Sequence, residues 1–190
     1  MADTDDDYDN DSINTPPAFY GDAKERVGTG PGSSKTAAAA IPGGESGYEP
    51  WYPSNIATDS SVKEFVTHFF QVSDDAGRDE EWVELFDEDA TVIIGNDEAK
   101  GRADIRKLRK RMWKDVEERK HRVVKVFPAN FTAEVASLHE IEYMLFGAVA
   151  YRLREGKGET VAGWAGHAQL KRDGLTAPWR IVFYRVYIQR

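Results

Sequence analysis

The apolar residues that follow residue 59 recur first at helical spacing. Ser61 and Glu64 have the Ser-x-x-Glu form of a capping box, which marks the start of a helix. The pattern predicts an amphipathic helix from Ser61 to about residues 74–77, with its apolar face in the core. Five apolar residues fall on that face: Val62, Phe65, Val66, Phe69 and Val72.

Three shorter elements are predicted next. A short aromatic helix carries Trp82, Leu85 and Phe86, and residues 91–94 form a strand that a Gly-Asn-Asp turn ends. A basic helix is expected over residues 102–118, with one apolar side: Ile105, Leu108, Met112, Trp113 and Val116. We expect its charges to form mostly a solvated face rather than a nucleic-acid surface: Arg106, Lys107, Arg109, Lys110, Arg111 and Lys114.

The remaining chain alternates apolar and polar positions as strands do. Four strands are predicted, at residues 123–127, 143–153, 161–170 and 180–188. Their connections favour an antiparallel sheet with one buried face. The segment 129–142 fits a strand, a helical insertion or a loop. Together these elements predict an α+β fold, a conical barrel of curved antiparallel sheet wrapped around three N-terminal helices. Its interior should hold Phe65, Phe69, Leu108, Met112 and Trp179.

The N-terminal segment, residues 1–58, differs in composition from the rest. It holds ten of the 33 acidic side chains and three of the 25 basic ones, so it carries almost all of the net charge of −8. Its Gly, Pro, Ser and Ala content predicts disorder, with Trp51 and Tyr52 best placed to dock on the domain. We therefore divide the chain into a disordered acidic tail, 1–58, and a folded domain, 59–190. Because that domain is near neutral, no nucleic-acid partner is expected.

Several classes of chemistry lack the residues that they need. The chain has no cysteine, which excludes disulfides, thiol nucleophiles and Cys-based metal sites. Its histidines show no metal-ligand spacing, so we expect no metal and no cofactor. No run approaches the roughly 18–20 apolar residues that span a bilayer, and the acidic N-terminus is unlike a signal peptide. The sequence thus predicts a cytoplasmic protein, with no membrane partner, that uses acid–base chemistry.

His121 is the strongest candidate for that chemistry. It stands where the basic helix passes into a strand, and its usual pKa of about 6.5 allows proton transfer at neutral pH. The alternative is a structural histidine whose ring bonds a backbone carbonyl group. Four aromatic residues would line a small-molecule pocket or simply fill the core: Phe69, Trp82, Trp113 and Trp164.

An ordered series of motifs resembles the SnoaL-like branch of the nuclear transport factor 2-like superfamily, in particular its fungal members. The series lies within residues 59–190 and comprises Glu-Trp-Val-Glu-Leu-Phe (81–86), Asp-Ala-Thr-Val-Ile-Ile-Gly (89–95), Gly-Arg-Ala-Asp-Ile-Arg (101–106), Met-Trp (112–113), His121, Val-Phe-Pro (126–128), Leu-Phe-Gly (145–147) and Phe-Tyr-Arg-Val-Tyr (183–187). The resemblance implies a conical α+β barrel with a deep hydrophobic pocket, and dimerisation through the outer face of the sheet.

The resemblance also implies site residues. Members similar to scytalone dehydratase carry a histidine after the third helix, which matches His121, and a second on a neighbouring strand, which corresponds to His139. Their aspartate after the first helix matches Asp74 or Asp75, and Asp75 enters our predicted site. The tyrosine that they carry on the first strand is absent, because residues 93–94 are isoleucines.

We therefore expect a cofactor-independent enzyme of secondary metabolism. It would be a dehydratase, isomerase or cyclase that acts by acid–base chemistry on a hydrophobic polyketide- or terpenoid-type intermediate. The alternative is a non-catalytic binding or dimerisation module of the same fold, which the missing tyrosine favours. A homodimer is expected because strand 180–188 has large apolar side chains on both faces. The alternative cover for the outer face is the chain's own Trp51 and Tyr52.

Overall fold

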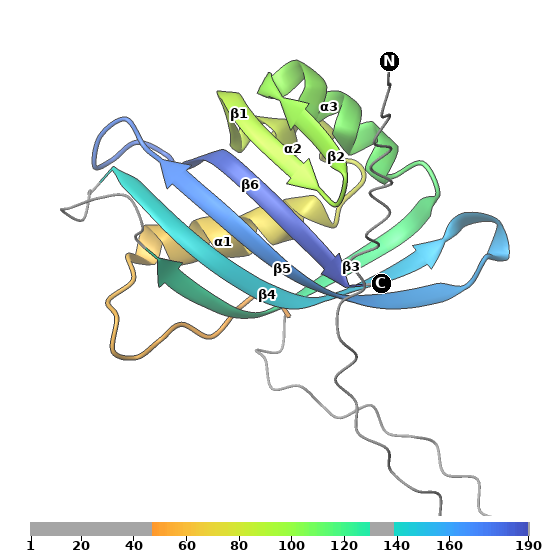
Figure 1. Ribbon diagram of the computed structural model, residues 1–190, viewed down its shortest axis with the longest axis horizontal. Coiled ribbons are helices and arrows are strands. Elements are labelled where there is room, and N and C mark those ends of the chain that lie inside the picture. Colours follow the sequence, from red (N-terminus) through yellow and green to blue (C-terminus); the bar gives the residue numbers. More distant parts are fainter. Residues whose placement is uncertain (1–46, 130–138, 190) are drawn as a thin grey trace, which may run out of the picture. The chain divides into compact units, whose positions relative to one another are not determined.

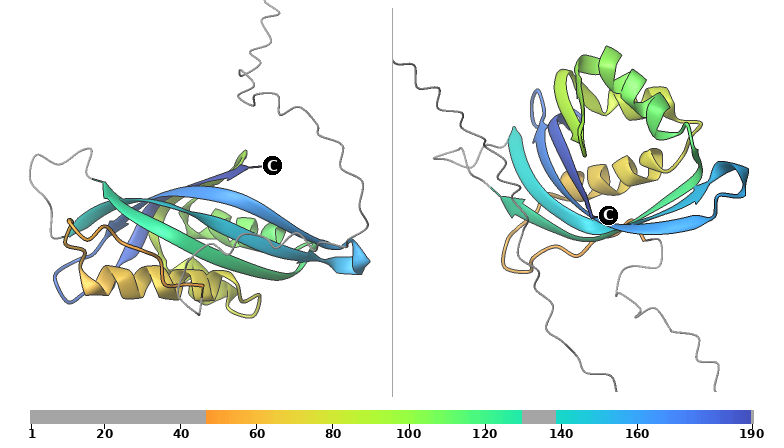
Figure 2. Two further views of the ribbon diagram at one scale, coloured as in Figure 1. Left: turned by 90° about the horizontal axis from the view of Figure 1, so that it is seen from below. Right: turned by 45° about the vertical axis from the view of Figure 1, so that its right-hand side comes forward.

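Six strands and three α-helices form the fold in the computed structural model, which describes residues 47–129 and 139–189 (Figure 1). The elements are α1 (Ser60–Ser73), α2 (Asp79–Glu84), β1 (Phe86–Ile94), β2 (Asp97–Lys100), α3 (Gly101–Met112), β3 (Val116–Ala129), β4 (Glu140–Leu153), a 3₁₀ turn (Arg154–Gly156), β5 (Glu159–Lys171) and β6 (Arg180–Gln189). The sheet curves around α1, while α2 and α3 lie beside β1 and β2 (Figures 1 and 2).

The strands follow the order β2-β1-β6-β5-β4-β3 in a single sheet. Neighbouring strands are antiparallel except for β1 and β6, which run parallel, with Thr91 paired to Phe183. The first strand of the fold therefore lies beside the last one in the sheet. The predicted α+β cone is confirmed, with one parallel junction in an otherwise antiparallel sheet.

All three helices have boundaries that differ from the predicted ones. α2 ends at Glu84, and Phe86, which we expected in this helix, begins β1. α1 begins at Ser60 because the Asp59 carboxylate caps it, accepting a 2.9 Å hydrogen bond from the backbone N–H of Ser61. α3 ends at Met112 rather than near residue 118, since β3 begins at Val116 and pairs there with β4. Pairing with a long strand thus overrides the apolar spacing that predicted a longer helix.

The segment 129–142, whose structure the sequence left open, belongs in part to two strands. Ala129 ends β3, and residues 140–142 begin β4. Residues 130–138 lie outside the described part of the chain.

The core lies between the apolar face of α1 and the concave face of the sheet. Of the residues expected inside, Phe69, Leu108 and Trp179 are at most 4% exposed. Phe65 and Met112 are only partly buried against the same cluster. The prediction of the core is therefore confirmed for three of its five residues, and the other two lie at its margin.

A close approach between two strands and an indole ring depends on Gly147 in β4. A Cβ atom there would lie 2.1 Å from the carbonyl oxygen of Arg122 and 3.1 Å from Cζ2 of Trp164. Since real Cβ atoms do not come so close to backbone oxygen, this position admits only glycine in the present packing. The absent side chain is what lets Trp164 lie against the sheet beside the site described below.

The chain before α1 also contacts the sheet. The backbone N–H of Trp51 donates a 2.9 Å hydrogen bond to the carbonyl oxygen of Val124 in β3. Tyr48 is 9% exposed, whereas the Trp51 side chain, which we expected to dock, is 54% exposed. Contacts with the fold therefore begin before residue 59, where the sequence placed the domain boundary.

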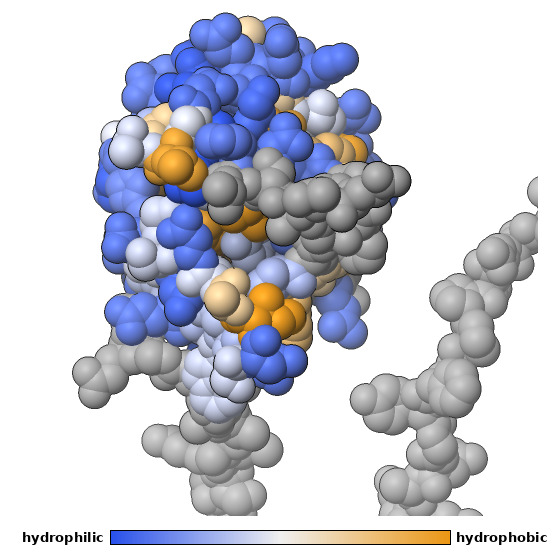
Figure 3. Space-filling model, turned by 90° about the vertical axis from the view of Figure 1, so that its left-hand side faces the viewer, coloured by the Kyte–Doolittle hydropathy of each residue, from blue (hydrophilic) through white to orange (hydrophobic). Residues whose placement is uncertain are grey.

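The surface shows no extended hydrophobic region on the face seen in Figure 3, where hydrophobic residues form small separate groups among hydrophilic ones. Over residues 47–129 and 139–189, none of the helices combines the length and the apolar composition that crossing a membrane would require.

Candidate active site

The C-terminal end of α1 is held by a buried arginine of α3. The Arg109 side chain is fully buried and donates hydrogen bonds to the carbonyl oxygens of Val72, Ser73 and Asp75, at 3.2, 2.8 and 2.7 Å. Its Nε also donates to Asp79 of α2 at 2.8 Å. Backbone N–H groups or Arg119 also donate to these carbonyl groups, so Arg109 adds a further donor to each of them at the helix end. Arg109 therefore fixes the backbone on both sides of Asp74, the residue that caps α1.

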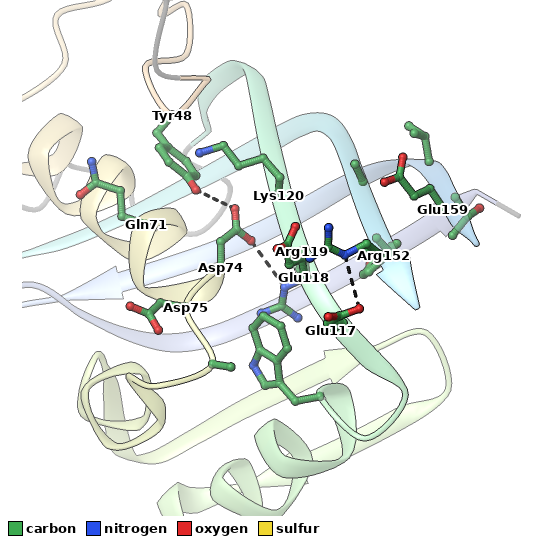
Figure 4. Close-up of a pocket in the computed structure, with 16 residues that line it drawn as sticks. Tyr48, Gln71, Asp74, Asp75, Glu117, Glu118, Arg119, Lys120, Arg152 and Glu159 are labelled. Carbon is green, nitrogen blue, oxygen red and sulfur yellow. Dashed lines mark hydrogen bonds and ion pairs between the residues drawn. The ribbon is translucent and has the colours of Figure 1, made fainter. Parts of the chain in front are cut away.

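Asp74 and His121 form a buried pair at this helix end. The Oδ1 atom of Asp74 lies 2.5 Å from Nδ1 of His121, and Oδ2 accepts a 2.6 Å hydrogen bond from the His121 backbone N–H. Oδ2 also accepts a 2.9 Å bond from the Tyr48 hydroxyl, and Arg119 Nε lies 3.5 Å from Oδ1. Figure 4 shows Tyr48 and Arg119 near Asp74. The Asp74 side chain is only 5% exposed.

The surroundings of this pair set its charge. Burial alone would raise the pKa of the Asp74 carboxyl, but the hydrogen bonds and charge of His121, with the charge of Arg119, hold that pKa below its usual value. Burial lowers the pKa of His121, and the positive charges of Arg119 and Arg109 lower it further, against the opposing effect of Asp74. At neutral pH the pair is thus a carboxylate and a neutral imidazole, with the ring proton on Nδ1.

The other ring nitrogen of His121 is available for proton transfer. Among the described residues, Nε2 has no hydrogen-bond partner, and the ring contacts Phe70 and Trp164 at 5.2 and 5.7 Å between centroids. The ring lines a cavity of about 40 Å³ with mostly apolar walls: Phe69, Phe70, Ser73, Trp82, Ile94, Met112, Arg119, Val149, Tyr151, Trp164, Tyr184, Val186 and Ile188. An imidazole held this way can act as a general base.

A larger groove, of about 660 Å³, lies on the Asp74 side of the pair (Figure 4). Arg119 and Tyr151 line both the groove and the cavity. The Nε atom of Arg119 is buried and has no hydrogen-bond partner among the described residues, and neither has the indole N–H of Trp164. The indole N–H beside His121 is therefore left without an acceptor, and Arg119 Nε has only its 3.5 Å ion-pair contact with Oδ1 of Asp74, which is uncommon for buried polar groups.

Some of the predicted site residues line the cavity beside His121, and others line the groove. Phe69, Trp82 and Trp164 line the cavity with His121, whereas Trp113 lines the groove. The predicted Asp75 also lines the groove, but its carboxylate accepts a 2.7 Å bond from the backbone N–H of Gly77.

The carboxylate that pairs with His121 is therefore Asp74, not Asp75. His139 is exposed just before β4, and its carbonyl oxygen accepts a bond from the backbone N–H of Arg172. Within the described residues, the hydrogen bonds and ring contacts of His121 are made with Asp74, Phe70 and Trp164, and not with His139.

Three residues that lie near the pair were not predicted from the sequence to belong to the site. Arg109 was placed on the solvated face of its helix, although it lies four residues after Ile105, on the apolar side. Arg119 is two residues before His121 on β3, so strand alternation puts both on one face. Tyr48 carries no such signal, because its segment has no periodic pattern.

A second histidine–carboxylate pair, His167 and Glu142, joins β5 and β4. Glu142 and His167 have opposite strand parity to Tyr143 and Trp164, which are buried, so the pair lies on the outer face of the sheet. In the described residues, no three His, Asp or Glu side chains converge as metal ligands would.

Neither a protein-family model nor a curated protein sequence matches the chain. Solved structures do resemble it in fold. A scytalone dehydratase-like protein from Novosphingobium aromaticivorans has a TM-score of 0.58 and 14% identity, with 68% of this chain and 83% of that one covered. The hexachlorocyclohexane dehydrochlorinase LinA-type3 from Novosphingobium barchaimii has a TM-score of 0.54 and 13% identity, with 69% and 86% covered.

ActVI-ORFA from Streptomyces coelicolor has a TM-score of 0.54 and 18% identity, and the match covers 69% of this chain and 94% of that one. Identities this low show the fold alone. The fold is that of the nuclear transport factor 2-like cone proteins, as the sequence motifs suggested.

Proposed function

We propose that the chain is a cofactor-independent enzyme in which His121 acts as a general base on a hydrophobic small molecule. The observation that carries the proposal is the Asp74–His121 pair, with Nδ1 and Oδ1 2.5 Å apart. Its Nε2 atom has no hydrogen-bond partner in the described part of the chain and lies beside an aromatic cavity. A neutral, buried imidazole oriented by a carboxylate is suited to accept a proton at neutral pH. The solved structures of similar fold include a dehydratase-like protein and a dehydrochlorinase, which supports elimination chemistry.

The pair suggests one order of events for a substrate that carries a carbonyl group. His121 Nε2 takes a proton from the carbon beside the carbonyl, and the electrons of the broken C–H bond pass to the carbonyl oxygen. Asp74 stabilises the imidazolium that results. Arg119, whose Nε makes no hydrogen bond within residues 47–129 and 139–189 and lies 3.5 Å from Oδ1 of Asp74, would donate to the enolate oxygen.

Three outcomes are open to such an enolate. In a dehydration it expels a β-hydroxyl group, which leaves as water with the proton that His121 holds. In an isomerisation that proton returns to another carbon. In a cyclisation the enolate carbon attacks a second carbonyl carbon of the same substrate, the electrons of that C=O π bond pass to its oxygen, and this oxygen takes the proton that His121 holds. None of these outcomes transfers electrons to a redox partner, so none needs a redox cofactor. The aromatic walls favour a ring-containing substrate of polyketide or terpenoid type, as in secondary metabolism.

The cavity must widen before such a substrate can bind. Its volume of about 40 Å³ falls below the roughly 300–1,000 Å³ of ligand pockets. Because Arg119 and Tyr151 line both the cavity and the groove of about 660 Å³, a movement of these two side chains would join the spaces. We propose that the substrate reaches His121 from the groove by this route.

A non-catalytic module of the same fold is the second candidate. The small cavity favours it, because the aromatic side chains already occupy most of the space that a ligand would need. In that case the Asp74–His121 pair would only hold α1 against β3. A molecule bound in the groove would then be released unchanged.

A screen of cyclic β-hydroxyketones distinguishes the two candidates. Binding is followed by tryptophan fluorescence, since Trp82, Trp113 and Trp164 line the two spaces, and conversion by mass spectrometry. The enzyme proposal expects loss of water or a shifted double bond, with conversion reduced about 100-fold or more in Asp74→Asn and His121→Gln. Binding without conversion would favour the non-catalytic module, and conversion that survives in His121→Gln would contradict His121 as the base.

A further inference from the structure

Residues 47–52, here called the N-terminal strap, run along the edge of β3 that faces away from β4. The backbone N–H of Val123 donates a 3.1 Å hydrogen bond to the carbonyl oxygen of Gly47, and Trp51 donates to Val124 at 2.9 Å. Gly47 has a φ of 75°, which a residue with a side chain rarely adopts. Backbone pairing on both sides of Tyr48 therefore fixes its position against β3.

Tyr48 is held from three further directions. Its carbonyl oxygen accepts a 3.2 Å bond from Oγ1 of Thr67 in α1, and Nζ of Lys120 lies 3.8 Å from the centre of its ring. Its hydroxyl donates to Oδ2 of Asp74 at 2.9 Å. Tyr48 is 9% exposed, so this charge-assisted bond is partly buried at the wall of the groove.

We propose that Tyr48 is a positioning residue for the Asp74–His121 pair, and that the N-terminal strap is therefore part of the active site. The inference rests on the proposed function for its effect on catalysis, but not for its effect on His121. The hydroxyl and the His121 backbone N–H hold Oδ2, which leaves Oδ1 directed at Nδ1 of the ring. Tyr48 thus sets both the orientation of the carboxylate and its strength as an acceptor.

The Tyr48 hydroxyl stays a donor over the working pH range. Burial raises its pKa, and the neighbouring Asp74 carboxylate raises it further. The other charged or titratable groups whose charges act on the pair or on Tyr48 come from three elements: Arg119 and Lys120 of β3, Arg109 of α3, and Tyr151 of β4, which acts on Asp74 and Arg119. Tyr184 of β6 also interacts with Arg119.

The direction of the effect follows from the hydrogen bond. Without the Tyr48 hydroxyl, the negative charge of Asp74 is shared with one donor fewer, so the carboxylate attracts the Nδ1 proton of His121 more strongly. The imidazolium form gains stability, and the pKa of His121 rises. When the Asp74 carboxylate is not held in one orientation, the His121 ring also spends less time in the tautomer and orientation in which Nε2 can accept a proton.

The test is the titration of the His121 ring by NMR in the full chain, with the signal assigned from its loss in His121→Gln. Tyr48→Phe removes one hydroxyl and should raise the pKa of His121 by about half a unit. Tyr52→Phe is the matched control, since Tyr52 lies in the same strap and its buried hydroxyl has no hydrogen-bond partner in the described residues. It should leave the titration of His121 unchanged.

Three results are decisive. A rise in Tyr48→Phe alone supports the proposal. An unchanged pKa of His121 in Tyr48→Phe, or equal shifts in both variants, overturns it, because the strap would then affect His121 only through the overall stability of the fold. Thermal unfolding of both variants shows that each is folded at the titration temperature.

Activity supplies a second readout once a substrate is known. Tyr48→Phe should lower kcat by about 3- to 10-fold with little change in KM, because the strap orients the base rather than binding the substrate. A raised KM with unchanged kcat would overturn the positioning role. If the wild-type chain converts no substrate, the proposed function fails, while the NMR titration still decides whether Tyr48 positions the pair.

Discussion

Arg109 of α3 donates a 2.8 Å hydrogen bond to the carbonyl oxygen of Ser73, the residue directly before Asp74. The guanidinium group also lies about equally far from two indole rings, 5.1 Å from the ring centres of Trp82 and Trp113. The charged side chain of Arg109 thus packs between two indole rings and also donates hydrogen bonds at the C-terminal end of α1. The position of the proposed catalytic carboxylate therefore depends on a residue of another helix.

Replacing Arg109 with methionine should destabilise the fold by about 3 kcal/mol or more, because three carbonyl groups at the end of α1 each lose one donor and the Asp79 carboxylate loses its buried ion-pair partner. Urea unfolding followed by far-UV circular dichroism measures the loss. Arg106→Met is the matched control on the same helix, since the Arg106–Glu80 ion pair is exposed and should matter little. Equal stability of the two variants would show that Arg109 does not hold the end of α1.

Gly147→Ala should cost about 2–3 kcal/mol of folding free energy. The added methyl group would meet the backbone oxygen of Arg122 at 2.1 Å, and backbone cannot move aside as a flexible side chain can. In Gly163→Ala, the methyl group meets only the Gln189 side chain, at 3.3 Å, so little destabilisation is expected. Thermal and urea unfolding of both variants provide the comparison, and a Gly147→Ala protein as stable as Gly163→Ala would contradict the packing of Trp164 on β4.

The ionisation of His121 should be visible in the pH dependence of stability. Its pKa is lower in the folded chain than in the unfolded chain, so the unfolded state binds more protons as the pH falls below about 7. Stability should therefore decrease from pH 7.5 towards pH 5, by at most about 1.4 kcal/mol per pH unit for this one group. Asp74, whose pKa is also lowered, contributes stability that is lost only at more acidic pH.

Urea unfolding at pH 7.5 and pH 5 isolates this contribution when the wild-type chain is compared with His121→Gln. Glutamine cannot take up a proton, so the variant should lose less stability on acidification. The same loss in both proteins would mean that His121 is not held in its neutral form.

The outer face of the sheet carries Phe127 and Phe146, whose rings stack 6.3 Å apart and are 43% and 40% exposed. Tyr187 of β6, on the same face, is 47% exposed, and Trp51 lies at the β3 edge rather than over this face. We propose that a second copy of the chain covers these rings, since exposed apolar groups of this kind mark interfaces.

Sedimentation velocity at tens of micromolar should then show a dimer for the wild-type chain. The double variant Phe127→Ser/Phe146→Ser should be monomeric. Leu175→Ser, which changes a residue 61% exposed in the β5–β6 connection, should remain dimeric. A wild-type monomer without aggregation would remove the proposal.

The conical fold could be predicted from the sequence, but the residues that form the site could be predicted only in part. Alternation in β4 places Tyr143, Leu145 and Val149 on one face, and all three are buried, because a two-residue period depends on the backbone alone. Asp74 and Asp75 could not be separated in the same way. Neighbouring residues at a helix end point about 100° apart, and only the place of His121 in three dimensions decides between them.

Arg109 shows a different limit. Its spacing from Ile105 and Met112 indicated the apolar side of α3, but its charge suggested solvent. The side chain is buried because carbonyl groups at the end of another helix accept its hydrogen bonds. Partners of this kind are far away in the sequence and leave no local pattern. The same is true of Tyr48, which is 26 residues before Asp74.

The central claim is that Nε2 of His121 removes a proton from carbon. The most direct measurement is the exchange of the α-hydrogens of a bound cyclic ketone with solvent deuterium, followed by NMR. His121→Gln should slow the exchange by about 100-fold or more while the ketone still binds, and His68→Gln, which changes a partly exposed histidine of α1, should not. Exchange at the wild-type rate in His121→Gln, or none with any ketone that the wild-type chain binds, would contradict the claim.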